Sequence, residues 1–243
     1  MLLENKTAIV YGGAGAIGSA VARVFAGEGA TVHLTGRTRE PLEDLAHAIS
    51  QTGGRAEAAP LDATDRAAVE QHADTVAQRS AGIDIAFNAT SSDDLHGTPL
   101  IGMAAGDVLR TVTKAVTTHL TVATAVARHM IGRRTGVILA MGGGREAIPL
   151  LGGSHVAWSA LAGLCRQLAA ELGPHGIRVC WLLSPGSPDP SKPPDDDPEA
   201  NLTLLHRRPR LEDVASAAAF VASGRAATMT ATEVNLTGGA VVD

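Results

Sequence analysis

Short aliphatic runs without internal polar alternation recur along the chain, each separated from the next by a longer segment with helical periodicity. Strands of this kind, alternating with helices, indicate a parallel sheet that is covered by helices on both faces. Because crossovers between parallel strands are right-handed, we expect an α/β fold, a Rossmann-type doubly wound parallel sheet of about seven strands. The expected strands are Thr7–Tyr11, Thr31–Thr35, Ala56–Leu61, Ile83–Asn88, Gly136–Met141, Arg178–Leu183 and Thr232–Leu236, and the expected helices are Ile17–Glu28, Glu40–Gln51, Arg66–Arg79, Asp107–Ile131, Val156–Leu172 and Leu211–Ala222.

The pattern runs through all 243 residues without a repeat or a break, which predicts a single domain. One segment departs from it. Ser184–Pro198 reads SPGSPDPSKPPDDDP, and its prolines and aspartates exclude a helix or strand there. It follows the carboxyl end of an expected parallel strand, the edge at which such sheets bind ligands. We interpret residues 184–205 as a substrate lid, with a surface loop of no binding role as the alternative.

Composition narrows the range of partners. Hydrophobic residues make up 45% of the chain and aromatic residues only 2%, which predicts an aliphatic core. The formal net charge of −5 gives no electrostatic reason to expect binding to nucleic acid or to an anionic membrane. No apolar run reaches the roughly 18 residues of a membrane span, and no signal-type segment opens the chain. We therefore expect a soluble, cytoplasmic protein without a metal site, in which Cys165 and Cys180 are buried free thiols.

A glycine-rich turn links the first expected strand to the first expected helix. Glycines there allow a tight turn and let backbone N–H groups approach a pyrophosphate, whose charge is favoured at a helix N-terminus. The placement favours a dinucleotide-binding turn over a merely structural one. The candidate cofactor contacts in the turn are Gly12, Gly13, Ala14, Gly15, Ile17 and Gly18.

The end of the second expected strand bears on the choice of cofactor. Folds that bind NAD usually place a carboxylate here, where it accepts a hydrogen bond from the ribose 2′-hydroxyl. This chain instead has Gly36 followed by Arg37. A guanidinium pairs with a 2′-phosphate through charge-assisted hydrogen bonds. Arg37 therefore predicts NADP(H) as the preferred cofactor, with NAD(H) as the alternative, unless Arg37 is only a solvated surface charge.

The whole chain resembles the short-chain dehydrogenase/reductase family. Gly12, Gly13 and Gly18 match that family's TGxxxGxG turn, although Tyr11 replaces its threonine and Ala16 its middle glycine. The resemblance implies further cofactor contacts after the third, fourth and sixth strands, and a closing helix and strand at Leu211–Ala215 and Asn235–Gly239. These further contacts are Asp62 with Ala63, Asn88 with Ala89, and Pro185 with Gly186.

The same resemblance exposes a departure at the expected active site. The family uses a tyrosine as proton donor, a lysine one helical turn later, a serine that orients the substrate and an asparagine that anchors a water. In this chain those positions hold Ser154, Trp158, Gly143 and Ala115, and the only tyrosine is Tyr11. A second register would place Trp158 and Ala162 at the tyrosine and lysine positions, which also supplies neither group. At the nicotinamide end, Pro188 stands where the family donates a backbone N–H that proline lacks.

Two residues beside the vacated tyrosine position are the candidate catalytic groups. Histidine is the residue type that changes charge between pH 5 and 8, so His155 would act as a general acid if it faces the pocket, or would be an ordinary helix-terminal histidine if it faces away. Ser154 would position a carbonyl or, as the alternative, cap the helix. Trp158 can line a pocket but cannot act as an acid.

These observations predict an NADP(H)-dependent oxidoreductase with a non-standard active site and a small-molecule substrate, such as an iminium or a conjugated carbonyl. Two alternatives stay open. One is a cofactor-binding regulatory or partner subunit without catalysis, and the other is a non-redox enzyme, such as a cyclase or isomerase, on the same scaffold. The resemblance also implies a homodimer or homotetramer that associates through helices 107–131 and 156–172.

Overall fold

The computed structural model describes residues 1–184, 186 and 197–242. Its centre is a seven-stranded sheet with the strand order β3-β2-β1-β4-β5-β6-β7, and every neighbouring pair is parallel. The order reverses between β1 and β4, which makes this the switch point of a doubly wound sheet. The strands are β1 (Thr7–Tyr11), β2 (Thr31–Gly36), β3 (Arg55–Pro60), β4 (Ile85–Asn88), β5 (Gly136–Met141), β6 (Ile177–Leu183) and β7 (Thr232–Asn235).

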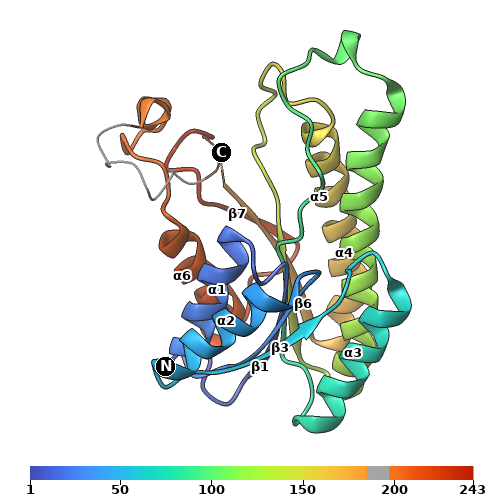
Figure 1. Cartoon of the computed structure of the whole chain (residues 1–243), viewed down its shortest axis with the longest axis vertical. Helices are drawn as coiled ribbons and strands as arrows, with labels where there is room; N and C mark the ends of the chain where they lie inside the picture. The colour runs from blue at the N-terminus through green and yellow to red at the C-terminus, as the bar shows by residue number, and fades with distance from the viewer. Residues whose placement is uncertain (185, 187–196, 243) are drawn as a thin grey trace.

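Helices cover both faces of the sheet (Figure 1). Helices α1, α2 and α6 pack on one face, and α3, α4 and α5 pack on the other. This arrangement confirms the expected Rossmann-type α/β fold. The helices are α1 (Ala16–Gly27), α2 (Arg39–Gln51), α3 (Arg66–Arg79), α4 (Ala105–Arg133), α5 (Ser154–Leu172) and α6 (Leu211–Ala222).

Strand β1 shows why the pattern lacks polar alternation. All five of its residues are buried, because its side chains point alternately to the two helical layers. Ala8 and Val10 join the core beneath α1 and α6, whereas Ile9 and Tyr11 join the core beneath α3 and α4. Cys165 and Cys180 are buried free thiols, as expected.

The expected elements are all present: about half of their ends coincide with the expected ends, and the others differ by one or two residues. The largest difference is at α4, which runs from Ala105 to Arg133 and ends where Arg134 adopts a left-handed conformation. Helix α5 begins at Ser154, two residues earlier than expected, because Gly153 takes the N-cap position. No helix within the described ranges is long and apolar enough to cross a membrane.

Only part of the expected lid can be placed. Pro185 and Pro188 lie outside the described residues, as does most of the Pro/Asp-rich segment. After it, a short 3₁₀ helix spans Pro198–Leu202 and leads into α6. The parallel strands all point their carboxyl ends toward the edge at which this segment, the glycine-rich turn and the start of α5 are found.

Candidate functional site

The glycine-rich turn is shaped by close backbone contacts. Gly12 has a φ of 76°, and a Cβ atom there would lie 2.6 Å from the carbonyl oxygen of Ala89. A Cβ atom on Gly18 would overlap the carbonyl oxygen of Gly12, so α1 can approach the turn only with glycine at this position. The N–H of Gly13 donates to the carbonyl of Thr35 at 2.8 Å and ties the turn to β2. The turn is therefore fixed in place by its neighbours.

The N-terminus of α1 opens from this turn without a side-chain cap. Gly15 is the N-cap residue, and the first turn contains no acidic residue. The N–H groups at such a helix end attract an anion, because they lack partners within the helix and carry the positive end of its dipole. The turn can thus hold a phosphate group through its backbone.

A cavity of about 340 Å³ extends from the turn across the ends of β2, β3 and β4. It brings together most of the predicted cofactor residues, including two that are distant in sequence, Arg37 and Asp62. Sequence analysis did not name several of its lining residues as cofactor contacts, and the charged one among them is Lys114 of α4, which lies immediately before Ala115. The lining residues are Gly12, Ala14, Gly15, Thr35, Gly36, Arg37, Thr38, Pro41, Leu61, Asp62, Ala63, Thr64, Ala89, Thr90, Ser91, Lys114 and Thr118.

The charges in this cavity are arranged around Asp62. Its carboxylate accepts hydrogen bonds from the N–H and hydroxyl of Thr64, at 2.9 and 2.8 Å. These bonds hold the pKa of Asp62 below its usual value, and the nearby Arg37 and Lys114 lower it further. Arg37 is exposed, and no ion pair within the described ranges holds it elsewhere. Lys114 pairs with Asp93, which follows β4.

The remaining predicted cofactor residues stand behind the cavity wall or apart from it. Gly13, Ile17 and Gly18 support the turn but do not line the cavity. Asn88 is buried at the end of β4, where its Oδ1 accepts hydrogen bonds from the N–H and hydroxyl of Thr90. Gly186, with a φ of 94°, lies near Arg208 at the beginning of the lid segment.

Ser154 belongs to a polar cluster that sequence analysis did not find. Its side chain is fully buried, its hydroxyl donates to Oδ1 of Asp94 at 2.6 Å, and Nε2 of His96 lies 2.9 Å from the same hydroxyl. The N-cap role considered for Ser154 is wrong, because the hydroxyl bonds to another loop instead of the free N–H groups of α5. A run of polar residues, SSDDLH, directly after β4 was the only sequence signal for this cluster.

His155 faces a different cavity from Ser154, because neighbouring residues on a helix point in different directions. That second cavity, of about 230 Å³, lies between α5 and the ends of β5, β6 and β7. The structure therefore does not bring the two candidate catalytic residues together. Its lining residues are Gly142, Gly143, Gly144, Arg145, His155, Trp158, Ser159, Ala162, Arg166, Trp181, Leu183 and Glu233.

Trp158 and Gly143 are in direct contact in this second cavity. A Cβ atom on Gly143 would overlap the indole ring of Trp158. The indole therefore occupies the space that any side chain at position 143 would need. Trp181 donates its indole N–H to Glu233 at 2.8 Å, and the guanidinium of Arg166 lies 5.0 Å from the Trp181 ring.

The only phenol in the chain, that of Tyr11, lines neither the cavity beside the glycine-rich turn nor the cavity at Trp158. Tyr11 is completely buried in β1, its hydroxyl has no partner among the described residues, and burial raises its pKa. His119 of α4 is also buried, and burial lowers its pKa to about 4 even though Nδ1 lies 2.8 Å from the carbonyl oxygen of Ala115. Neither side chain lines the dinucleotide cavity, the cavity of about 340 Å³ that extends from the glycine-rich turn.

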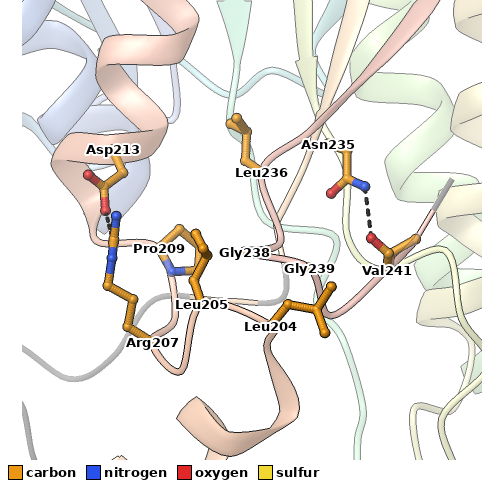
Figure 2. Close-up of a pocket in the computed structure, with 10 residues that line it drawn as sticks. All are labelled: Leu204, Leu205, Arg207, Pro209, Asp213, Asn235, Leu236, Gly238, Gly239 and Val241. Carbon is orange, nitrogen blue, oxygen red and sulfur yellow. Dashed lines mark hydrogen bonds and ion pairs between the residues drawn. The ribbon is translucent and has the colours of Figure 1, made fainter.

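A third cavity, of about 470 Å³, lies where the end of the lid segment meets β7 (Figure 2). Leu204 and Leu205 form one wall, and Gly238 and Gly239 form another. An ion pair between Arg207 and Asp213, at 2.7 Å, closes one side. The described part of the expected lid is thus packed against the last strand rather than free of the domain.

Three comparisons with known proteins agree with this architecture. A family model described as "Enoyl-(Acyl carrier protein) reductase" matches residues 12–241. The chain is 31% identical to the A-factor type gamma-butyrolactone 1′-reductase of Streptomyces virginiae, over 98% of this chain and 96% of that protein. It is 26% identical to 2,3-dihydro-2,3-dihydroxybenzoate dehydrogenase of Bacillus subtilis, over 99% of this chain and 97% of the relative.

A solved structure extends the comparison to three dimensions. A short chain dehydrogenase from Burkholderia cenocepacia J2315, solved in complex with NADP, superposes with a TM-score of 0.85. It is 28% identical, and the match covers 99% of each chain. Together, the family match along almost the whole chain, the relatives and the shared fold show that this chain belongs to the short-chain dehydrogenase/reductase family of oxidoreductases.

Proposed function

We propose that this chain is an NADP(H)-dependent oxidoreductase that works without the family's tyrosine–lysine pair and acts on a small carbonyl or imine substrate. The observation that carries the cofactor choice is the exposed Arg37, which lines the dinucleotide cavity next to Gly36. The position directly after β2 thus holds a guanidinium and not the carboxylate that would repel a 2′-phosphate. A guanidinium in this place forms charge-assisted hydrogen bonds with that phosphate.

The cavity fits a dinucleotide in two further respects. The backbone around Gly12 and Gly18 leaves no room for side chains, and the uncapped N-terminus of α1 offers N–H groups to a pyrophosphate. Asp62, which lines the same cavity, can accept hydrogen bonds from an adenine. The solved relative from Burkholderia, which holds NADP, supports the same cofactor.

When bound, the nicotinamide would supply or accept the hydride, which is the difficult part of the chemistry. The chain's own residues then need to position the substrate and exchange one proton with it. Ser154, Trp158, Gly143 and Ala115 stand where the family keeps its catalytic side chains. None of these four can serve as a proton donor tuned to neutral pH, so the proton must come from another residue.

Titration of the protein with NADPH and with NADH, followed by the fluorescence of the reduced nicotinamide, tests the cofactor assignment. We expect NADPH to bind at least about tenfold more tightly, from one charge-assisted contact. Equal affinities, or tighter binding of NADH, would contradict it. NADPH oxidation with a panel of aldehydes, ketones and cyclic imines tests the reaction.

A second function is favoured by one observation, the contact of Trp158 with Gly143. An indole filling this place suits a protein that binds the dinucleotide without redox turnover, as a regulatory or partner subunit. That function predicts tight NADPH binding together with no oxidation across the whole substrate panel.

We also propose that the chain forms a homodimer or homotetramer through α4 and α5. Large apolar side chains are exposed on both helices, among them Leu109, Leu120 and Ile131 on α4 and Val156 on α5. Burying such side chains against a second copy would remove them from water. Light scattering should give at least twice the mass of one chain, and Leu120→Glu should lower it; a monomeric wild-type protein would overturn this proposal.

A further inference from the structure

The cluster of Asp94, Ser154 and His96 joins two parts of the chain at the carboxyl edge of the sheet. Asp94 and His96 lie in the loop that follows β4, and Ser154 is the first residue of α5. The loop is fixed to the turn before α5, because the N–H of Gly97 donates to the carbonyl of Leu150 at 2.9 Å. Gly152 allows this approach, since a Cβ atom there would overlap the carbonyl oxygen of Leu95. The cluster therefore sits on a constrained segment.

The hydrogen bonds of the cluster determine where its protons are. An ionised carboxylate only accepts, so the hydroxyl of Ser154 donates to Asp94, at 2.6 Å. Ser154 Oγ has then given its only proton, and the contact with Nε2 of His96, at 2.9 Å, requires the imidazole to donate. Neutral His96 thus carries its proton on Nε2. Its other ring nitrogen, Nδ1, has no hydrogen-bond partner within the described ranges.

The cluster adjoins the dinucleotide cavity. Ser91, three residues before Asp94, lines that cavity. Asp93 pairs with Lys114, which lines it too. The loop after β4 therefore runs from the cavity wall directly to the cluster, at the edge where parallel sheets bind their ligands.

Accessibility separates the roles of the three residues. Ser154 is 0% exposed, so its hydroxyl cannot attack a substrate. Asp94 also bonds to the serine and not to the histidine, which differs from the order of a nucleophilic triad. His96 is exposed. Asp94 is exposed as well, but as an ionised carboxylate it has no proton to give. Ser154 and Asp94 are therefore positioning residues, and His96 is the exposed member that can carry a proton to a substrate.

We infer that His96 is the catalytic residue that exchanges a proton with the substrate oxygen, in an inference that rests on the proposed oxidoreductase function. In the reducing direction, a nicotinamide held in the dinucleotide cavity would supply a hydride to the carbonyl carbon. The electron pair of the C=O π bond moves to the oxygen, which takes the proton from Nδ1 of the His96 imidazolium. The neutral product form of His96 is the Nε2–H form that Ser154 holds, and water returns the proton to Nδ1.

Several charged groups lie in the elements that carry and adjoin the cluster. Asp94 acts on it through Ser154, from the same loop. From α4, Lys114 is compensated by Asp93, and Arg110 is compensated by Asp107 at 3.1 Å. From α5, His155 lines the second cavity instead. Of the charged side chains named here, the Asp94 carboxylate is the one that contacts the Ser154–His96 pair directly.

The first test needs neither cofactor nor substrate. In the ¹⁵N-labelled protein above neutral pH, long-range ¹H–¹⁵N spectra should show His96 as the Nε2–H tautomer. Ser154→Ala should convert it to a mixture of tautomers, while the matched histidine His175, at the opposite end of α5, should not respond. A mixture of tautomers already present in the wild type would contradict the hydrogen bond from Nε2 of His96 to Ser154 and overturn the inference.

The second test compares His96→Asn, His155→Asn and the control His175→Asn in NADPH oxidation with the substrate panel. We expect His96→Asn to lower kcat/KM by about 100-fold or more and to abolish its pH dependence, while the Kd for NADPH stays within about twofold. Ser154→Ala should lower kcat/KM by about tenfold with the same Kd.

The outcomes separate the two proposals. If the wild type binds NADPH and turns over while His96→Asn turns over equally well, only the role of His96 is wrong. If His155→Asn alone loses activity, the proton comes from the second cavity and the inference is overturned. If the wild type oxidises NADPH with no member of the panel, the proposed function fails and takes the catalytic role with it, whatever the tautomer of His96.

Discussion

The dinucleotide cavity and the start of α5 stand at the same edge of one sheet, yet they depart from the family pattern to very different degrees. Around the cavity, the chain keeps the features that act through the backbone: Gly12, Gly18 and the uncapped helix end at Gly15. Around α5, the proposed alignment with the family places residues of other chemistry at the positions of its catalytic side chains. Trp158 even occupies the space of a side chain at position 143.

The difference teaches that the two sites are constrained by different physics. A phosphate-binding turn depends on backbone geometry, which is lost with a single added Cβ atom. A proton donor can be replaced by any group of suitable pKa that reaches the substrate. In the proposed mechanism the acid can therefore lie in the loop after β4 and not on α5, whereas the turn cannot be rebuilt in the same way.

The largest effect is expected at the turn. Gly18→Ala would push the new Cβ atom into the carbonyl of Gly12, and the affinity for NADPH should fall by about 100-fold or more, equivalent to about 2.7 kcal/mol. Fluorescence titration measures the affinity, and circular dichroism establishes that the variant is folded. Gly27→Ala is the matched control, because nothing lies within 4 Å of a Cβ atom at that exposed position of α1. Undiminished affinity in a folded Gly18→Ala protein would show that the turn does not bind the cofactor.

A smaller effect sharpens the choice between cofactors. Arg37→Ala removes the cation at the cavity rim, so NADPH affinity should fall by about 10- to 100-fold while NADH affinity changes little. Calorimetric titration with both dinucleotides measures the difference. Arg39→Ala serves as the control, since Arg39 pairs with Glu43 on the exposed surface of α2. An equal loss for both cofactors would mean that Arg37 contacts the part that they share.

The contact between Trp158 and Gly143 predicts a coupled pair of substitutions. Gly143→Ser should lower the free energy of unfolding by about 1–3 kcal/mol, the usual cost of overpacking. In the background of Trp158→Ala, the same change should cost much less. Denaturant unfolding of the four proteins in this cycle gives the coupling energy. Gly144→Ser, where no atom lies within 4 Å of the added Cβ, should be nearly neutral, and additive effects at 143 and 158 would refute the contact.

The smallest effect is expected from the titration of Asp62. Hydrogen bonds from Thr64 lower its pKa in the folded protein, so its contribution to stability is present above the unfolded pKa of about 3.9 and is lost as the pH falls through the folded value. As the pH is lowered from about 7 to about 3, the Tm of Asp62→Asn should therefore fall less steeply than the Tm of the wild type. The exposed Asp44 provides the control, as Asp44→Asn. Parallel curves for the wild type and Asp62→Asn would show that these hydrogen bonds do not form.

Local patterns predicted the fold and the cofactor half of the site. The runs that form β1 and β2, and the glycines between Gly12 and Gly18, are recognisable because each feature is contained in a few consecutive residues. Even Arg37 and Asp62, which are distant in sequence, lie close to strand ends: Arg37 directly follows β2, and Asp62 is the second residue after β3. Because the carboxyl ends of parallel strands lie at the same edge of the sheet, such residues are brought together by the fold itself.

The polar cluster at α5 could not be found in the same way. Ser154 lies 60 residues from Asp94 and 58 from His96, and the three meet only because the loop after β4 packs against the turn before α5. That packing depends on Gly152, which no local pattern marks. His155 was predicted as a candidate catalytic residue because it adjoins Ser154 in sequence, but adjacent positions on a helix face different neighbours.

The tryptophans of this chain give the second cavity its own optical signal. The sequence contains two, Trp158 and Trp181, and both line that cavity, while the dinucleotide cavity has none. Arg166 and Glu233 are already in contact with the Trp181 indole. A molecule entering between α5 and β7 would therefore change the polarity and quenching around every emitting indole at once, and a shift in intrinsic fluorescence would reveal it before any label is attached.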